Sequence, residues 1–376
     1  MPKKTSTLRC RVRLVAAALI LAWASSRVAA DPSLLEAARD ALAEDRAADA
    51  ELLYRRALDA EPDLISAYRG LAEALAAQER RPEAVAVLLR VGEGLIRAGV
   101  HGRALEVLRR ALELAPRSAA VHGLLGRALS LDRRYVEAAG HLGLAVELGT
   151  ADLRTLLYLG AAQWENGRVE EAEAVYRQAA AIAGASFLPF HQLGRLLSWQ
   201  GRTVEAVAVL QVAAEMTNAV DVELDFARAL QKVGETEKAL AAFQRVVALA
   251  PDRSHGRYGL AQVLARTGDV DGAREQLEIY RRLYDREQQR VREQELAKAR
   301  LGRGWELLRQ GGTREAIAHF ESLPAAPDAL LGLAAAHTAA GNPGAAVDLL
   351  ERAVALAPER GDLRLRLAEA RLEASQ

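Results

Sequence analysis

One short pattern of small and large residues recurs along most of the chain at a nearly constant step. Its copies include NGRVEEAEAVYRQAAAI at 166–182 and QGRTVEAVAVLQVAAEM at 200–216. Each copy has a turn, an alanine, a large apolar residue four positions later and usually a small residue three further on. The most frequent step, 34 residues, predicts an array of helical repeats. The anchoring alanines are Ala50, Ala84, Ala104, Ala138, Ala172, Ala206, Ala239, Ala273, Ala316 and Ala346.

The alternation of small and large residues fits pairs of antiparallel helices. Two helix axes approach to about 8–10 Å only where the side chains at the crossing are small. We therefore expect Gly160 to face Ala172, and Tyr176 to fill the gap to the next repeat. Glycines in the turns, as in ENGR at 165–168, fit the left-handed residue that commonly ends a helix. A helical hairpin cannot bury its apolar face alone, so stacking of neighbours must stabilise the array.

With these residues in place, the chain resembles the tetratricopeptide-repeat family from about residue 31 to its end. Residues 187–220 match the family motif, and residues 119–152 and 153–186 carry similar sets. The matching residues of 187–220 are Phe190, Leu193, Gly194, Leu197, Ala206, Leu210 and Ala213. The resemblance implies an all-α, right-handed helical-repeat solenoid of about ten helix-turn-helix units. The segment from Gly361 to Gln376 is expected to form a polar capping helix at its C-terminal end.

Irregular steps predict where the array is interrupted. We expect an N-terminal array over 31–287, a long charged connecting helix over 274–300, and a C-terminal array with its capping helix over 297–376. Between Ala84 and Ala104 the step is only 20 residues. Two interpretations stay open for residues 65–118: three helices that share one, or a degenerate pair of repeats.

The first thirty residues differ from the rest. They hold six basic residues and no acidic one, with the apolar run LVAAALILAWA at 14–24. This pattern predicts a secretory signal cleaved after Ala30, and hence an exported protein, periplasmic or secreted. An uncleaved N-terminal anchor is the alternative, although spanning a membrane takes about 20 apolar residues. After cleavage, 44 basic residues would face 50 acidic ones, a balance that argues against nucleic-acid binding.

A search for reactive chemistry in the sequence finds none. The seven histidines show no metal-ligand spacing such as H-E-x-x-H, and there is no phosphate-binding loop or nucleophile elbow. The only cysteine, Cys10, lies in the leader. We therefore predict a non-enzymatic protein with no catalytic residues, no metal and no cofactor.

By resemblance, the first helices of successive repeats line a concave groove that takes peptides. The positions expected to point into it hold Arg127, Arg154, Trp164, His191, Arg195, Trp199, Arg228, Lys232, Tyr258 and Arg266. Arginine makes bidentate hydrogen bonds to carboxylates, and tryptophan offers a flat apolar surface. We therefore expect a protein or peptide partner with an acidic or C-terminal carboxylate segment. The alternative is that these arginines are ordinary surface residues, with Trp164 and Trp199 wedged between repeats.

Four functional interpretations follow from the sequence, the last of which is an enzyme with a site in the bore of the superhelix. The first is an interaction scaffold or adaptor of the bacterial cell envelope. The second is a docking subunit of an envelope enzyme or secretion complex, which would use the 274–300 helix. The third is a cell-wall carbohydrate binder that stacks sugars on its aromatic residues.

Overall fold

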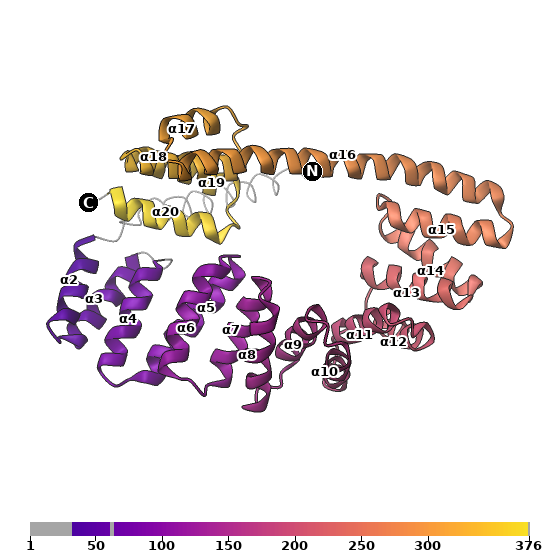
Figure 1. The fold of residues 1–376 in the computed structure, drawn as a ribbon, viewed down its shortest axis with the longest axis horizontal. Coiled ribbons are helices and arrows are strands. Elements are labelled where there is room, and N and C mark those ends of the chain that lie inside the picture. Colours follow the sequence, from indigo (N-terminus) through magenta and orange to yellow (C-terminus); the bar gives the residue numbers. More distant parts are fainter. Residues whose placement is uncertain (1–31, 61–63, 375–376) are drawn as a thin grey trace, which may run out of the picture. The chain divides into compact units, whose positions relative to one another are not determined.

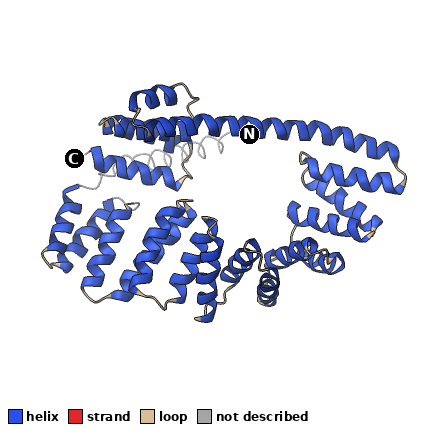
Figure 2. Cartoon of the chain, in the orientation of Figure 1, coloured by secondary structure: helices blue, strands red, loops and turns tan. Residues whose placement is uncertain are grey.

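The computed structural model describes residues 32–60 and 64–374, and every regular element in these ranges is an α-helix (Figures 1 and 2). The described residues fall into two compact units. The central unit runs from Arg117 to Ala299. The terminal unit combines the residues up to Pro116 with those from Arg300 onward. The predicted leader, residues 1–30, lies outside the described residues.

The helices follow one another in antiparallel pairs joined by short turns. Those of the terminal unit are α2 (Pro32–Ala43), α3 (Ala47–Ala60), α4 (Ile65–Ala77), α5 (Arg81–Arg97), α6 (His101–Leu114), α17 (Thr313–Glu321), α18 (Pro327–Ala339), α19 (Pro343–Leu356) and α20 (Gly361–Ala374). Those of the central unit are α7 (Ala119–Leu131), α8 (Tyr135–Glu147), α9 (Leu153–Glu165), α10 (Val169–Ala181), α11 (Leu188–Trp199), α12 (Thr203–Met216), α13 (Val220–Val233), α14 (Thr236–Leu249) and α15 (Ser254–Thr267). The 40-residue helix α16 (Val270–Arg309) continues from the central into the terminal unit. The predicted all-α repeat architecture is confirmed.

Small residues lie where the helices of a pair cross, as the sequence predicts. All ten anchoring alanines are buried. The expected partner of Gly160 was wrong, however. A Cβ atom on Gly160 would lie 2.6 Å from Cε1 of Tyr176, so the glycine makes room for the aromatic ring of its own repeat. Gly126 and Gly194 stand in the same way against Leu142 and Leu210, each sixteen residues later.

The turns depend on a single left-handed residue. Gly167, Gly201, Gly234 and Gly268 have φ angles of 75°, 79°, 85° and 90°. Asn166, in contrast, has φ −83°, so in this turn it is the glycine that takes the left-handed conformation. Glycine adopts that conformation without the steric cost that a Cβ atom brings.

The two irregular regions have different structures. Residues 65–114 form three helices, and α5 packs against both α4 and α6. The charged segment 274–300 is the middle of α16, which begins four residues earlier and ends nine residues later. The helix is longer because both of its ends pack within repeats: Tyr280 lies against Tyr258 of α15, and Trp305 against Phe320 of α17. Between them, residues 289–300 are all exposed.

A polar clasp joins neighbouring repeats at two places with identical sequence offsets. In the central unit the Glu173 carboxylate accepts from Arg177 Nη2 at 2.8 Å, from Arg202 Nη1 at 2.6 Å and from Gln200 Nε2 at 3.4 Å. Arg202 also donates to Glu205 at 2.6 Å. In the terminal unit the same arrangement is built from Glu51, Arg55, Gln78, Arg80 and Glu83.

One repeat further along the central unit, this clasp is missing. Val207 stands there in place of Glu173. A cleft of about 790 Å³ opens between α12 and α14, with Val207, Phe226 and Val233 among its lining residues. The polar contacts between repeats are therefore local features, and the small-to-large packing is the general one.

We predict that the clasp stabilises the central unit in a pH-dependent way. Burial alone would raise the pKa of the Glu173 carboxyl, but hydrogen bonds from Arg177, Arg202 and Gln200 outweigh it and hold the pKa below its usual value. Such a group contributes stability above its unfolded-state pKa, and the contribution is lost as pH falls through the folded-state pKa. Glu173→Gln should therefore lower the free energy of unfolding at neutral pH by about 1–2 kcal/mol.

Urea unfolding of the wild type and Glu173→Gln at pH 7 and in acid measures this effect. The difference between the two proteins should shrink as Glu173 becomes protonated. Glu237→Gln, at an exposed position of α14, is the matched control and should change little. An equal loss at both pH values would show that the charge of Glu173 is not what stabilises the contact.

Candidate functional site

The ten residues predicted to bind a partner all lie on first helices of the central unit. Arg127 is on α7, and Arg154 and Trp164 are on α9. His191, Arg195 and Trp199 are on α11. Arg228 and Lys232 are on α13, and Tyr258 and Arg266 are on α15. We call the surface that they share the first-helix face.

Four of these residues meet around an acidic side chain, Asp225 of α13. His191 is buried, and its Nε2 lies 2.9 Å from Asp225 Oδ2. Arg195 Nε lies 3.9 Å from the same oxygen, and Arg228 Nη1 lies 3.8 Å from Oδ1. The Arg195 guanidinium also sits over the ring of Trp164, 5.6 Å from its centroid. We call these five residues the Asp225 cluster.

The geometry of the Asp225 cluster leaves its arginines available. Separations of 3.8 and 3.9 Å are longer than the 2.7–3.2 Å of a hydrogen bond. Asp225 therefore attracts both guanidinium groups without using up their donors. The side chains of Arg195 and Arg228 are 47% and 46% exposed, so an incoming carboxylate can reach them. His191, by contrast, holds Asp225 in place and is too buried to present itself.

Aromatic residues flank the cluster on both sides along the chain. Arg127 lies over Tyr158 at 5.7 Å from the ring centroid. Tyr258 of α15 begins a ladder with Tyr280 and Tyr284 of α16, with ring centroids 5.0 and 5.6 Å apart. Tyr258 and Tyr284 are 44% and 40% exposed. Rings so exposed offer flat surfaces against which a partner can stack.

The other predicted residues are spread along the same helices. Trp199 is 66% exposed, so it is not wedged between repeats. Arg266 Nη1 donates to the Gln231 carbonyl oxygen at 3.4 Å. Arg154 and Lys232 are exposed on their helices.

Sequence reasoning missed Asp225, the residue around which the cluster is built. A signal for it was present, because Asp225 stands exactly one 34-residue step after His191. Two residues at the same register of adjacent repeats lie side by side on neighbouring first helices. A search for basic and aromatic residues passed over the carboxylate that orients them. Tyr280 and Tyr284 were missed because they lie on α16, outside the first-helix register.

The described residues hold no group of three or more His, Cys, Asp or Glu side chains arranged to bind a metal ion. In the same part of the chain, no helix combines the length and the apolar character that crossing a membrane requires. The apolar run at 14–24 lies outside the described residues.

Models of known protein families match three stretches of the repeat array. A family model described as a tetratricopeptide repeat matches residues 92–152 and 224–287, and a second with the same description matches residues 327–370. These three stretches of the chain are tetratricopeptide repeats. Such repeats generally serve as non-enzymatic scaffolds that bind protein or peptide partners, and the matching models indicate no catalytic family.

Known proteins with tetratricopeptide repeats are similar to parts of the chain. The tetratricopeptide repeat-containing protein trd-1 of Caenorhabditis elegans is 26% identical over 147 residues, 39% of this chain and 19% of that protein's length. The crystal structure of YrrB, a TPR protein with an unusual peptide-binding site, is 20% identical with a TM-score of 0.44, covering 48% of this chain and 93% of YrrB.

Two further solved structures are similar to parts of the chain. PilF of Pseudomonas aeruginosa is 22% identical with a TM-score of 0.48, covering 55% of this chain and 94% of PilF. The C-terminal part of a TPR repeat-containing protein from Cytophaga hutchinsonii is 16% identical with a TM-score of 0.47, covering 72% and 95%. These likenesses concern the fold, and peptide binding is a stated property of YrrB alone among them.

Proposed function

We propose that the protein is a non-enzymatic scaffold of the bacterial cell envelope that binds an acidic segment of a protein partner on its first-helix face. The observation that carries the proposal is the Asp225 cluster. Two half-exposed guanidinium groups are held next to each other, and neither is within hydrogen-bond distance of the carboxylate between them. A partner carboxylate would complete the hydrogen bonds that Asp225 leaves open.

Trp164 adds a second kind of contact. Its ring is half-buried beneath Arg195, which holds the guanidinium plane in position. Preorganised arginine loses less conformational freedom on binding than a free side chain. An apolar residue next to the partner's acid would find Trp164 and the exposed Trp199 as neighbours on α9 and α11. A C-terminal carboxylate and an acidic side chain both fit this chemistry.

The envelope location rests on the sequence of the first thirty residues, with its basic start and apolar run. We propose that this leader directs export and is cleaved. Docking to an envelope enzyme or secretion complex is the second candidate. The observation that favours it is the continuously exposed stretch of α16 at 289–300. A carbohydrate partner would instead use Trp199 and the tyrosine ladder.

We predict that Arg195→Ala combined with Arg228→Ala weakens binding of an acidic peptide at least about tenfold, because both charge-assisted contacts are lost. Fluorescence anisotropy with a labelled glutamate-rich peptide measures the affinity. The same peptide with an amidated C-terminus shows how much the terminal carboxylate contributes to binding. Binding should weaken as salt is added.

The matched control is Arg286→Ala combined with Arg290→Ala, which removes two exposed arginines of α16 in the same unit. This variant should bind the peptide like the wild type. Unchanged affinity in the Arg195, Arg228 variant would refute the assigned site. Deleting residues 289–300 distinguishes the docking function from peptide binding. A docking subunit would lose its complex, and a peptide binder would keep its ligand.

A further inference from the structure

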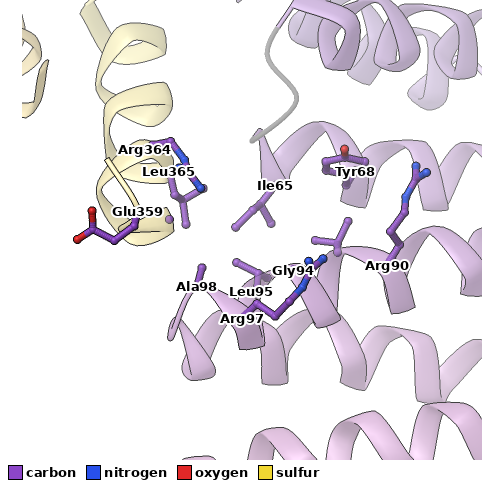
Figure 3. A pocket seen from close by; sticks show the side chains of 12 residues that line it. Ile65, Tyr68, Arg90, Gly94, Leu95, Arg97, Ala98, Glu359, Arg364 and Leu365 are labelled. Atoms are coloured by element: carbon purple, nitrogen blue, oxygen red, sulfur yellow. The ribbon is translucent and has the colours of Figure 1, made fainter. Parts of the chain in front are cut away.

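The terminal unit contains a cavity of about 600 Å³ whose walls come from distant parts of the sequence. Ile65 and Tyr68 of α4 and the last two turns of α5 form one wall. The other wall is the start of α20 with Glu359 before it. Figure 3 shows Arg364 and Leu365 extending from α20 opposite Ile65 and Leu95. A volume of this size lies within the range of ligand pockets in proteins.

Two close contacts set the walls of this cavity against each other. A Cβ atom on Gly361, the first residue of α20, would lie 2.7 Å from Cβ of Ala98, the residue that ends α5. Only glycine allows so close an approach at this point. Arg103 of α6 and Glu369 of α20 form an ion pair nearby. The cavity therefore lies between α5 and α20 within one compact unit.

The charged residues of the lining are mostly basic. Arg90, Arg97 and Arg364 contribute three guanidinium groups, and Glu359 contributes one carboxylate. All three arginines are exposed. Arg364 Nη1 donates to the Pro358 carbonyl oxygen at 2.6 Å, which fixes the direction of its side chain. An anionic occupant would meet positive charge on both walls.

Spacing along α5 limits what kind of anion can bind. Arg90 and Arg97 are seven residues apart, which places their backbones about 10 Å apart along the helix axis. One carboxylate cannot bridge that distance. An extended peptide in the polyproline II conformation has three residues per turn and rises about 3.1 Å per residue, so acidic side chains three residues apart lie on one face, about 9 Å apart. Between the two arginines the lining is apolar, with Val91 and Leu95 on α5 and Leu365 on α20.

The occupant cannot be the chain's own leader on grounds of charge. Residues 1–30 hold six basic residues and no acidic one, so three arginines would repel them. Charge complementarity points to another protein that carries acidic residues.

We infer that this cavity is a second binding site, for an extended acidic segment of a protein partner with two acidic side chains three residues apart and an apolar side chain between them. Arg90 and Arg97 bind the two carboxylates, and Ile65, Leu95 and Leu365 receive the apolar side chain. Arg364 contacts the bound segment from α20. This site is separate from the Asp225 cluster, and it exists whether or not that cluster binds a peptide.

The test uses the full chain and the labelled peptide acetyl-Gly-Glu-Ala-Leu-Glu-Gly-amide, whose blocked ends carry no charge. Binding is measured by fluorescence anisotropy. Arg90→Gln, Arg97→Gln and Arg364→Gln should each weaken binding about tenfold. Arg109→Gln, at an exposed position of α6 outside the lining, should not. All of these variants are made in the Arg195→Ala, Arg228→Ala background, so that binding at the Asp225 cluster does not contribute to the signal.

Further measurements make the inference falsifiable. The same peptide with both glutamates changed to glutamine should not bind, and with leucine changed to serine it should bind more weakly. Added peptide should slow amide hydrogen exchange in α20 as well as in α5, since both walls contact it. Equal binding of the glutamine peptide, or full competition by succinate at peptide concentration, would overturn the proposed occupant. Unchanged exchange in α20 would overturn the two-walled site. Equal melting temperatures confirm that the variants are folded.

Discussion

Truncating Tyr176 to alanine is expected to lower the free energy of unfolding of the central unit by about 3–5 kcal/mol. Tyr176 is fully buried and fills the space that Gly160 leaves in its own repeat. Removing the ring opens a cavity at the contact between α9 and α10, and the apolar cluster that continues through Leu193 and Leu197 loses a member. Urea unfolding followed by circular dichroism measures the loss.

Tyr176→Phe is the matched control, and it is not expected to destabilise the unit. The Tyr176 hydroxyl is buried and has no hydrogen-bond partner among the described residues. Burial also raises the pKa of this hydroxyl, so it stays neutral. Deleting an unsatisfied polar group should leave stability unchanged or increase it by about 1 kcal/mol. If phenylalanine destabilised the unit as strongly as alanine, the ring would not be the source of the stability.

Two further variants each change a helical glycine to alanine, and we expect one to lower and the other to raise the free energy of unfolding. At Gly160 the new Cβ would lie 2.6 Å from Cε1 and 2.8 Å from Cδ1 of Tyr176. We expect Gly160→Ala to destabilise the central unit by about 1–3 kcal/mol, because the crossing is overpacked. At Gly140 of α8 a Cβ would meet nothing within 4 Å. Gly140→Ala should stabilise the helix by about 0.5–1 kcal/mol.

The contact can be isolated by combining Gly160→Ala with Tyr176→Ala. Once the ring is gone, the added methyl group no longer clashes, and alanine at 160 should cost nothing further. Thermal unfolding of the four proteins gives the coupling energy between the two positions. Additive losses would mean that Gly160 serves some purpose other than making room for Tyr176.

The fold could be predicted from the sequence because the same small-to-large pattern returns in one phase. Ten alanines were placed at the crossings from their spacing alone, and all ten are buried. The partner of Gly160 could not be predicted from spacing, since Ala172 and Tyr176 lie on the same face of α10, one turn apart. Which of them meets the glycine depends on the axial offset between the two helices, and the sequence does not specify that offset.

The candidate sites were less accessible to sequence reasoning. Register along the repeat placed Arg195 and Arg228 on first helices, where the structure has them. It could not show that His191 is buried, because neighbouring repeats decide how much of a side chain remains exposed. The cavity beside α20 could not be predicted from the sequence. Its walls are about 270 residues apart in the chain, and no periodicity connects them.

The stacking of Arg195 on Trp164 has a spectroscopic consequence. A cation resting on an indole ring perturbs its excited state, so tryptophan emission should respond whenever that guanidinium moves. Trp305 of the terminal unit lies outside the cluster and supplies a comparison signal. The protein thus contains its own optical probe at the Asp225 cluster, and ligands can be screened there without attaching a dye.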